Sequence, residues 1–373
     1  MFENKFLNKT NISFIIFLFV NSLFSVKYLS RYTSKYILIT FLIILFYFFI
    51  WLKKDLITNL LKFLKIKNIY IVLIYIILVS FVFYFIPKET LHVDRWSVIA
   101  SFWDNYFNGK YVYFAQSFDG NYPGPMPFYF ILALPFYIIG ELGIFSVLGI
   151  FVFMFLMKNK KGNNYFSIYF ILIASSFFYV WEVCSRSNIF VNGVLILSSV
   201  ILFFKYYQKK LSANILFGII FGLLISTRNV FVIPYIITFL FALRTKIIDF
   251  KNLLIVMIIA FLVFAIVFLP FVLNHFDDFM KMNPFIIQSN YLMPFKYTLI
   301  FLLLAFIISF FIKAENDIYY FSGLILFFTI LFYFVYIIFN NNFELAFFES
   351  KADISYFILC LPFSIYYLFI SEK

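Results

Sequence analysis

Long apolar runs recur from one end of the sequence to the other, and they constrain the fold more strongly than any other feature. Each run extends for about 17 to 20 residues, which is the length of helix that crosses a hydrocarbon core about 30 Å thick. Hydrophobic residues make up 65% of the chain and charged residues only 12%. A soluble domain carries about 25% charged residues. The chain is therefore expected to be a polytopic integral membrane protein.

The spanning segments are expected to be helices. Backbone amides in lipid must find hydrogen bonds within the membrane, which leaves only helices and closed barrels. A barrel would show polar and apolar residues alternating in segments of about ten, and this sequence has no such pattern. The prediction is an all-α membrane helix bundle with about 11–13 transmembrane helices, in a single transmembrane domain over 1–373. Spans are expected at 11–27, 36–52, 69–87, 125–157, 165–181, 189–204, 212–227, 230–243, 252–273, 297–312, 318–339 and 353–370.

Charged residues in the loops indicate how these spans are oriented. The net charge of +12 is attributed to the positive-inside rule and not to nucleic-acid binding. Loops rich in Lys and Arg are expected to face the cytoplasm, and they lie at 53–67, 158–161, 205–210 and 244–251. Other polar segments then face outward from a plasma (inner) membrane, and functional residues are expected in them: 88–124, 182–188, 228–229, 274–296 and 340–353. The loop with Lys27, Arg31 and Lys35 also falls outside, against the rule.

Segment 88–124 is the first long extracytoplasmic loop. Apolar residues recur at helical spacing after Asp94, so an interfacial amphipathic helix is expected from Asp94 to Tyr106. Asp94 follows the end of a span, where a carboxylate is less hydrated than in bulk water and is placed to act as a base. A surface ion pair with Arg95, or a helix cap, explains the same residue on structural grounds alone.

Two short outer turns each carry an Arg followed within two residues by Asn. They read Ser185-Arg186-Ser187-Asn188 and Thr227-Arg228-Asn229. Arginine forms forked, charge-assisted hydrogen bonds to phosphate oxygens, so the two Arg residues are candidates to hold the phosphate of a lipid-linked substrate. Snorkelling to lipid headgroups is the alternative. Their place on the outer side opposes the topological preference for positive charge, which favours a functional role.

Three features follow one another along the first outer loop. Asp94 stands at its start, Asn108-Gly109-Lys110-Tyr111 ends the expected helix, and Tyr122-Pro123-Gly124-Pro125-Met126-Pro127 leads into the next apolar segment. This order resembles the GT-C superfamily of membrane glycosyltransferases, which take a sugar from a polyprenyl-phosphate carrier. The resemblance covers about 88–235 and implies a GT-C-like fold. Arg95 stands where some branches have a second acidic residue, so a divalent metal has no support and no cofactor is expected.

The resemblance implies a mannosyltransferase-like hexosyltransferase that acts on the extracytoplasmic side. Its partners would be a polyprenyl-phosphate-linked sugar, membrane lipids and a glycan, lipid or cell-envelope acceptor, with no nucleic acid. Asp94 would be the catalytic base, and the two outer Arg residues would stabilise the leaving phosphate. Tyr111 and Trp96 would line the sugar. The substrate-binding candidates are Arg95, Trp96, Asp104, Tyr111, Asp119, Tyr122, Arg186, Asn188, Arg228 and Asn229.

Other classes of membrane protein share part of this pattern. An envelope polysaccharide (O-antigen-type) polymerase also carries paired outer Arg residues, but it is expected to have one long late outer loop, and 274–296 is modest in length. A non-enzymatic lipid flippase or transporter is expected to show internal repeats or charged residues at mid-membrane depth. The sequence shows neither. Cys184 and Cys360 are far apart, and His92 and His275 are too few for a metal cluster.

Overall fold

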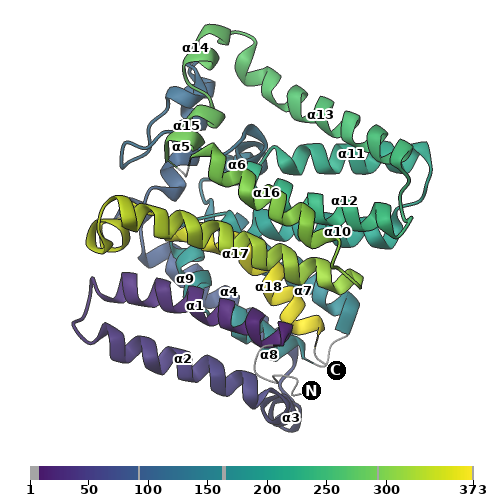
Figure 1. Cartoon of the computed structure of the whole chain (residues 1–373). Helices are drawn as coiled ribbons and strands as arrows, with labels where there is room; N and C mark the ends of the chain where they lie inside the picture. The colour runs from purple at the N-terminus through teal and green to yellow at the C-terminus, as the bar shows by residue number, and fades with distance from the viewer. Residues whose placement is uncertain (1–7, 91–92, 162–164, 292–293, 372–373) are drawn as a thin grey trace. The chain divides into compact units, whose positions relative to one another are not determined.

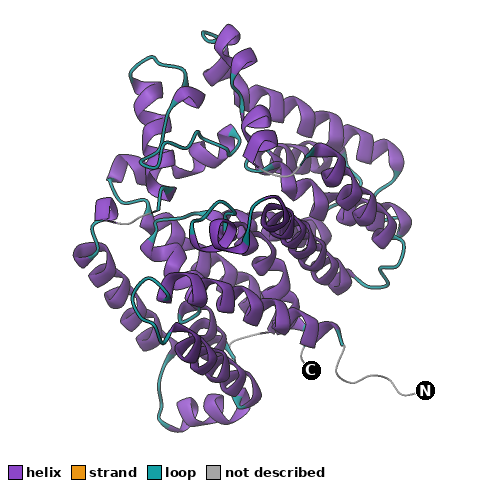
Figure 2. Ribbon diagram, turned by 60° about the vertical axis from the view of Figure 1, so that its left-hand side comes forward, coloured by secondary structure: helices purple, strands orange, loops and turns teal. Residues whose placement is uncertain are grey.

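The structure is a computed structural model that describes residues 8–90, 93–161, 165–291 and 294–371. These residues form helices and no strand, which confirms the all-α prediction (Figure 2). Five of their helices are long and apolar enough to cross a membrane: α1 (Lys9–Leu29), α4 (Asn68–Phe85), α10 (Ile189–Tyr206), α13 (Phe250–Val272) and α17 (Glu315–Asn340). Helix length and composition are thus consistent with a multi-pass membrane protein.

The other predicted spans are shorter helices or pairs of helices that meet at a break. The pairs are α2 (Tyr36–Leu52) with α3 (Lys54–Phe63), α6 (Pro127–Ile139) with α7 (Gly143–Lys161), and α8 (Phe166–Ala174) with α9 (Phe177–Cys184). The short apolar helices are α11 (Leu211–Ile225), α12 (Val232–Arg244), α16 (Phe295–Ser309) and α18 (Leu361–Ile370), which continues the 3-10 helix η6 (Ile354–Cys360). Every predicted span therefore coincides with a helix or a helix pair, whereas α3 lies in segment 53–67, which is expected from the sequence to be a loop.

The break between α8 and α9 differs from the continuous span expected at 165–181. Side chains of two other helices take up the backbone groups that the break leaves open. The Asn21 side-chain oxygen accepts a hydrogen bond from the Phe177 N–H at 2.7 Å, and the Tyr47 hydroxyl donates to the Ser175 carbonyl at 2.8 Å. An unsatisfied backbone group in an apolar environment costs several kcal/mol. These tertiary contacts make the break tolerable, and apolar length alone does not reveal it.

Two compact units can be distinguished in the chain. The first comprises Met1–Leu91, Gly143–Gly193 and Ile330–Lys373, and the second comprises His92–Leu142 and Val194–Thr329. In the first unit, α1 contacts α2, α9 and α18 (Figure 1). Every residue of α18 is buried. A helix that is apolar all round belongs in the centre of a bundle, and α18 occupies that place in its unit.

In the second unit, α11 packs along α13, and α12 packs along α16 (Figure 1). Gly218 and Gly222 lie one turn apart on α11, and both face α13. A Cβ atom at Gly222 would lie 2.5 Å from the Ala260 carbonyl oxygen, so only glycine permits this approach. Small residues at this spacing are typical of close helix pairs in membranes. The Arg244 guanidinium donates to the carbonyls of Phe310 and Ile312, just beyond the end of α16.

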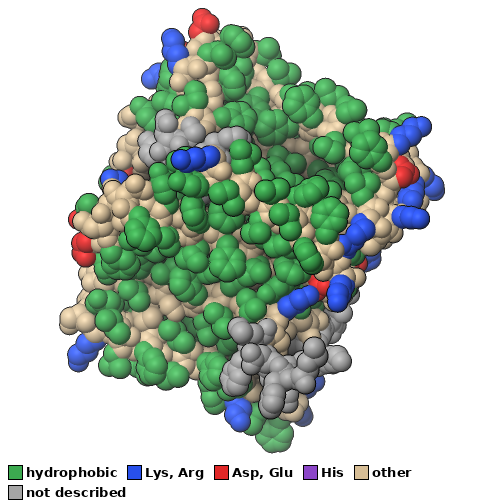
Figure 3. Space-filling view, in the orientation of Figure 1, with side chains coloured by type: hydrophobic (Ala, Val, Ile, Leu, Met, Phe, Trp, Pro, Cys, Tyr) green, Lys and Arg blue, Asp and Glu red, His purple; other side chains and the backbone are tan. Residues whose placement is uncertain are grey.

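The surface of the chain is rich in apolar side chains. Hydrophobic side chains cover most of the surface in view, and Lys and Arg gather where α12 ends and α13 begins (Figure 3). Large residues on α13 are exposed, among them Phe261 and Ile266, at 69% and 58%. Exposed apolar surface on this scale is unfavourable in water and suits contact with lipid.

Candidate functional site

Asp94 lies directly before α5 (Arg95–Phe107), at the position where the sequence predicts a helix. Its side chain forms no cap with the helix, and no ion pair to Arg95 is found among the described residues. Instead, Oδ2 accepts hydrogen bonds from Ser117 Oγ at 3.0 Å and from Asn121 Nδ2 at 2.7 Å. The carboxylate is half-buried. It is therefore held by side chains of a loop and not by its own helix.

The loop that holds Asp94 is itself closed by hydrogen bonds. The Gly120 N–H donates to the Ser117 carbonyl at 2.9 Å, and the Ser117 N–H donates to the Asn121 carbonyl at 2.9 Å. Gly120 adopts a φ of +76°, which glycine reaches without steric cost. The Phe118 N–H donates to Ser97 Oγ at 3.0 Å, so the first turn of α5 also contacts the loop. These bonds fix the two donors of Asp94 in place.

Tyr111 connects the same loop to the segment that follows α13. The side chain is only 3% exposed, and its hydroxyl donates to the Met282 carbonyl at 2.7 Å. Its own carbonyl accepts a hydrogen bond from Asn105 Nδ2 at 3.1 Å. Burial, together with the nearby Asp278 charge, raises the pKa of Tyr111 above its usual range. Tyrosine is protonated at neutral pH in any case, and the raised pKa extends this donor role to more alkaline pH.

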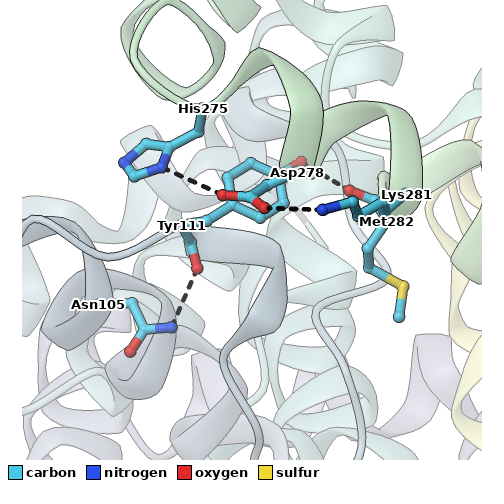
Figure 4. A network of polar contacts seen from close by, with 6 residues as sticks. All are labelled: Asn105, Tyr111, His275, Asp278, Lys281 and Met282. Carbon is cyan, nitrogen blue, oxygen red and sulfur yellow. Dashed lines mark hydrogen bonds and ion pairs between the residues drawn. The ribbon is translucent and has the colours of Figure 1, made fainter.

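A cluster of ionisable side chains lies beside the Tyr111 ring, on α14 (Phe276–Lys281) and the residue before it (Figure 4). Asp278 is 3.5 Å from His275 Nδ1 and 3.9 Å from Lys281 Nζ. All three side chains are at least one quarter exposed, so these contacts contribute little to stability. The cluster marks the place where the segment after α13 meets the loop after α5.

The Pro-rich segment pairs with the second of the two Arg turns. The Met126 N–H donates to the Thr227 carbonyl at 3.0 Å, and the Phe128 N–H donates to the Ser226 carbonyl at 2.9 Å. Arg228 follows directly, and its guanidinium carbon lies 5.1 Å from the centre of the Tyr129 ring. Two motifs that are about 100 residues apart in the sequence thus meet in space.

Other contacts hold the Pro-rich segment in place. Gln288 Nε2 donates to the Gly124 carbonyl at 2.6 Å, and the Tyr113 hydroxyl donates to the Pro125 carbonyl at 3.3 Å. Gln288 belongs to α15 (Pro284–Tyr291). Sequence reasoning missed Gln288, because only its place in segment 274–296, which is predicted to face outward, distinguished it from other polar residues. The segment is positioned by three separate parts of its unit.

The remaining predicted residues of this unit occupy more open positions. Asp104 is exposed and accepts a hydrogen bond from the Tyr137 hydroxyl. Tyr122 is half-buried, and its hydroxyl accepts from Gln116 Nε2 at 3.3 Å. Asp119 and Asn229 are exposed, whereas Arg95 and Trp96 are half-buried in the first turn of α5. Asp94, Tyr111 and Arg228 are therefore the predicted residues with the most fully bonded or buried surroundings in this unit.

Arg186 belongs to the other unit and is only 1% exposed. Its guanidinium donates to the carbonyls of Cys184 at 2.7 Å, Ile86 at 2.9 Å and Phe83 at 3.5 Å. It also lies over the Phe83 ring, 5.0 Å from the ring centre. These partners are main-chain carbonyls at the ends of α4 and α9. Its predicted role in phosphate binding would require the guanidinium to exchange these carbonyls for phosphate oxygens.

The backbone around Arg186 forms a Schellman motif at the end of α9. The Ser187 N–H donates to the Glu182 carbonyl at 2.9 Å, the Arg186 N–H donates to the Val183 carbonyl, and Arg186 has a φ of +54°. Glycine usually occupies this position, and other residues lose about 1 kcal/mol or more there. The hydrogen bonds of the Arg186 side chain are therefore expected to contribute more to the free energy of folding than this backbone conformation costs.

Two further polar side chains are buried next to this turn. Glu182 accepts a hydrogen bond from the Phe190 N–H at 2.7 Å, which satisfies one of the open donors at the start of α10. Sequence reasoning did not select Glu182, because an acidic residue near a span end has no distinctive pattern. Asn188 is fully buried, and neither polar atom of its side chain has a hydrogen-bond partner in the described part of the chain. Such groups are rare and mark strained or functional positions.

No metal centre is formed by the described residues, since no three His, Cys, Asp or Glu side chains are grouped as ligands. Comparison of the chain with protein-family models, with curated proteins and with solved structures finds no match.

Proposed function

We propose that the chain is a membrane glycosyltransferase that moves a hexose from a polyprenyl-phosphate carrier to a hydroxyl group of a glycan, lipid or cell-envelope acceptor. The carboxylate of Asp94 carries this proposal. Ser117 and Asn121 hold its Oδ2 atom, whereas no donor among the described residues contacts Oδ1. A general base needs a fixed position and an oxygen that can accept a proton. Both conditions are met by this side chain.

The proposed reaction is a direct displacement. Asp94 accepts the proton of the acceptor hydroxyl while that oxygen forms a bond to the anomeric carbon of the hexose. The bond between this carbon and the phosphate oxygen breaks, and polyprenyl phosphate leaves with the electron pair. The configuration at the anomeric carbon is inverted. A cation is needed beside the leaving phosphate, because negative charge builds up there in the transition state.

Arg228 is the cation that the proposal places at the leaving phosphate. It belongs to the same unit as Asp94, and it follows the turn that pairs with the Pro-rich segment. It is 8% exposed, so water screens its charge only weakly. The Tyr129 ring limits the positions of the guanidinium, and such restriction lowers the entropy lost on binding an anion.

Tyr111 takes a different role in this proposal from the one that the family resemblance implies. A side chain that is 3% exposed and bonded to the Met282 carbonyl positions the loop, so contact with the sugar falls to more open side chains. Trp96, Asp119 and Tyr122 are half-buried or exposed and belong to the same loop region. Aromatic rings and carboxylates are suited to the apolar faces and hydroxyls of a sugar.

The test is turnover of polyprenyl-phosphate mannose and polyprenyl-phosphate glucose by the purified full chain, with the lipid and glycan fraction of the producing cells as acceptor. Release of polyprenyl phosphate is measured. The Asp94→Asn variant is expected to lose about 10²–10⁴-fold in rate, because general base catalysis contributes that much.

Asp277 is an exposed carboxylate of the same unit, so Asp277→Asn is the matched control and should retain the wild-type rate. Retention of more than about a tenth of the rate by Asp94→Asn would remove this residue from the base role. Failure of the wild-type chain to consume either donor would contradict the proposed donor class.

A further inference from the structure

The short helix α3 turns sharply away from α2 within the first unit (Figure 1). The two helices meet at Lys53, where the chain bends by 73°. α2 is almost entirely apolar and packs against α1, which is long and apolar enough to cross a membrane. With α2 crossing the membrane beside α1, a helix inclined by 73° to it lies close to the plane of the membrane surface.

Apolar side chains form an exposed stripe along α3. Leu56, Leu60 and Phe63 are 59%, 50% and 81% exposed, and they recur at the spacing of one helix face. Thr58 is two residues away from both leucines, so it lies on nearly the opposite side of the helix, and it is buried. The stripe therefore points away from the protein. Large apolar side chains in such a position are unfavourable in water and favourable in lipid.

Contacts with the rest of the unit fix this orientation of α3. The helix packs against α8, and the hydroxyl of Tyr165, which precedes α8, donates to Asp55 Oδ1 at 2.9 Å. Beyond the end of α3, the Ile66 N–H donates to the Leu61 carbonyl at 3.0 Å, a hydrogen bond that is typical of a defined helix end. Segment 53–67 thus contains a fixed helix and not only a loop that marks the topology.

Lysines accompany the apolar stripe, since segment 53–67 contains five lysines and one aspartate. Lys53, Lys62, Lys65 and Lys67 are exposed, and within the described ranges none of these four forms an ion pair. The helix dipole favours Lys62 in the last turn of α3, but it does not extend to the lysines beyond. The positive-inside rule accounts for the lysines but not for the apolar stripe beside them. The combination is typical of helices that lie in the interface and attract anionic lipid.

We propose that α3 and the lysines after it form a binding surface for anionic phospholipids such as phosphatidylglycerol. The exposed stripe enters the edge of the hydrocarbon layer, and Lys62, Lys65 and Lys67 attract the phosphate groups. Phosphatidylcholine offers the same acyl chains, but its headgroup has no net charge, so the surface selects lipid by charge. The lipids are those of the cytoplasmic leaflet, which segment 53–67 is predicted to face. The proposal does not depend on the transferase activity.

The test measures which lipid surrounds α3 in the purified full chain, reconstituted into vesicles of phosphatidylcholine. A fluorophore is attached to the cysteine of Leu60→Cys, with Cys184 replaced by Ser. Phosphatidylglycerol or phosphatidylcholine with the same brominated acyl chains is then included, because acyl-chain bromine quenches only a fluorophore that lies in lipid. Both lipids should quench. Phosphatidylglycerol should be preferred by at least about fivefold, since each lysine near an anionic surface contributes about that factor.

The lysines are tested by combining Lys62→Gln, Lys65→Gln and Lys67→Gln in the labelled chain. Quenching should remain, because the apolar stripe is intact, whereas the preference for phosphatidylglycerol should largely disappear. The three side chains are exposed, so the variant should keep the wild-type thermal stability. A preference that survives this triple substitution would overturn the proposal.

The matched control combines Lys205→Gln, Lys209→Gln and Lys210→Gln, which removes the same charge from another loop that is predicted to face the cytoplasm. This variant should keep the preference at Leu60, and an equal loss in both triple variants would reflect general surface charge and contradict a specific surface. A fluorophore at Phe261, which is 69% exposed within α13, should be quenched by both lipids without a comparable preference. Absence of quenching at Leu60 would mean that the stripe lies in water or against a second copy of the chain, and would also refute the proposal.

Discussion

The loop around Asp94 and the turn around Arg186 are both polar connections that the sequence places on the outer side, yet their charges have opposite surroundings. Asp94 is half-buried, and its partners are the side chains of Ser117 and Asn121. Arg186 is almost fully buried, and its hydrogen-bond partners are main-chain carbonyls. A charge held by a loop remains accessible to a substrate, whereas a charge bonded to helix ends holds those ends together.

The contrast has a physical basis in how helices end. The last turn of a helix leaves carbonyl groups without partners, and in an apolar environment they must be satisfied. Arg186 supplies donors to such carbonyls at the ends of α4 and α9, and no carboxylate can do so. Asp94 stands before the start of a helix, where it is free to turn its acceptors toward the loop. The position of a charged side chain relative to a helix end therefore determines whether it bonds to helix carbonyls, as Arg186 does, or faces a loop, as Asp94 does.

The largest effect that tests this comparison is expected on stability at Arg186. Arg186→Met keeps the apolar stem but leaves buried carbonyls without donors, so it should destabilise the chain by about 2–4 kcal/mol. Arg186→Gly loses the same bonds but removes the strain of a φ of +54°, and it should recover about 1 kcal/mol relative to Met. The measurement is unfolding by denaturing detergent.

Arg31→Met is the control for the Arg186 variants, because Arg31 is exposed in the same unit and its loss should change stability by less than about 0.5 kcal/mol. If Arg186→Met is as stable as the wild type, the guanidinium is not a structural clamp. Arg186 would then return to the role of a phosphate ligand.

A second test compares the accessibility of the two segments. Single cysteines at Asn121 and Ser187 are placed in a background in which Cys184 is Ser, and an impermeant thiol reagent is added outside. Asn121 is exposed and Ser187 is fully buried. Cysteine at 121 should react at least about a hundredfold faster, because a buried site reacts only after local opening. Equal rates would mean that the 185–188 turn opens to solvent in the membrane and is available to a substrate.

The smallest expected effect concerns the two donors of Asp94. Asn121→Ala removes one hydrogen bond from a half-buried carboxylate and should lower stability by about 1 kcal/mol, and Ser117→Ala should cost somewhat more because its hydroxyl also accepts from the Asn121 N–H. Transfer activity should fall several-fold through misplacement of Oδ1, much less than in Asp94→Asn. Because the donors act through Asp94, the loss of stability caused by Asn121→Ala should largely disappear in an Asp94→Asn background. Fully additive losses would show that Asn121 stabilises the loop independently of Asp94.

The sequence by itself was sufficient for the all-α class and for the positions of the apolar helices. Helices in lipid satisfy their own backbone, so apolar length alone locates them. Gly140 ends α6 with a φ of +89°, a conformation for which the glycine itself is the signal. The helix that begins after Asp94 also follows from local periodicity, since α5 runs from Arg95 to Phe107.

Only the tertiary structure decided which polar residues are buried and what they contact. The break at Ser175 depends on Asn21 and Tyr47, which are more than 100 residues away in the chain. Local patterns contain no information about such distant partners, so the sequence could not show that Arg186 is bonded to carbonyls or that Asn121 holds Asp94. Polar groups in an apolar environment take whatever partner the packing brings within hydrogen-bond distance, because leaving them unsatisfied costs more than any local preference.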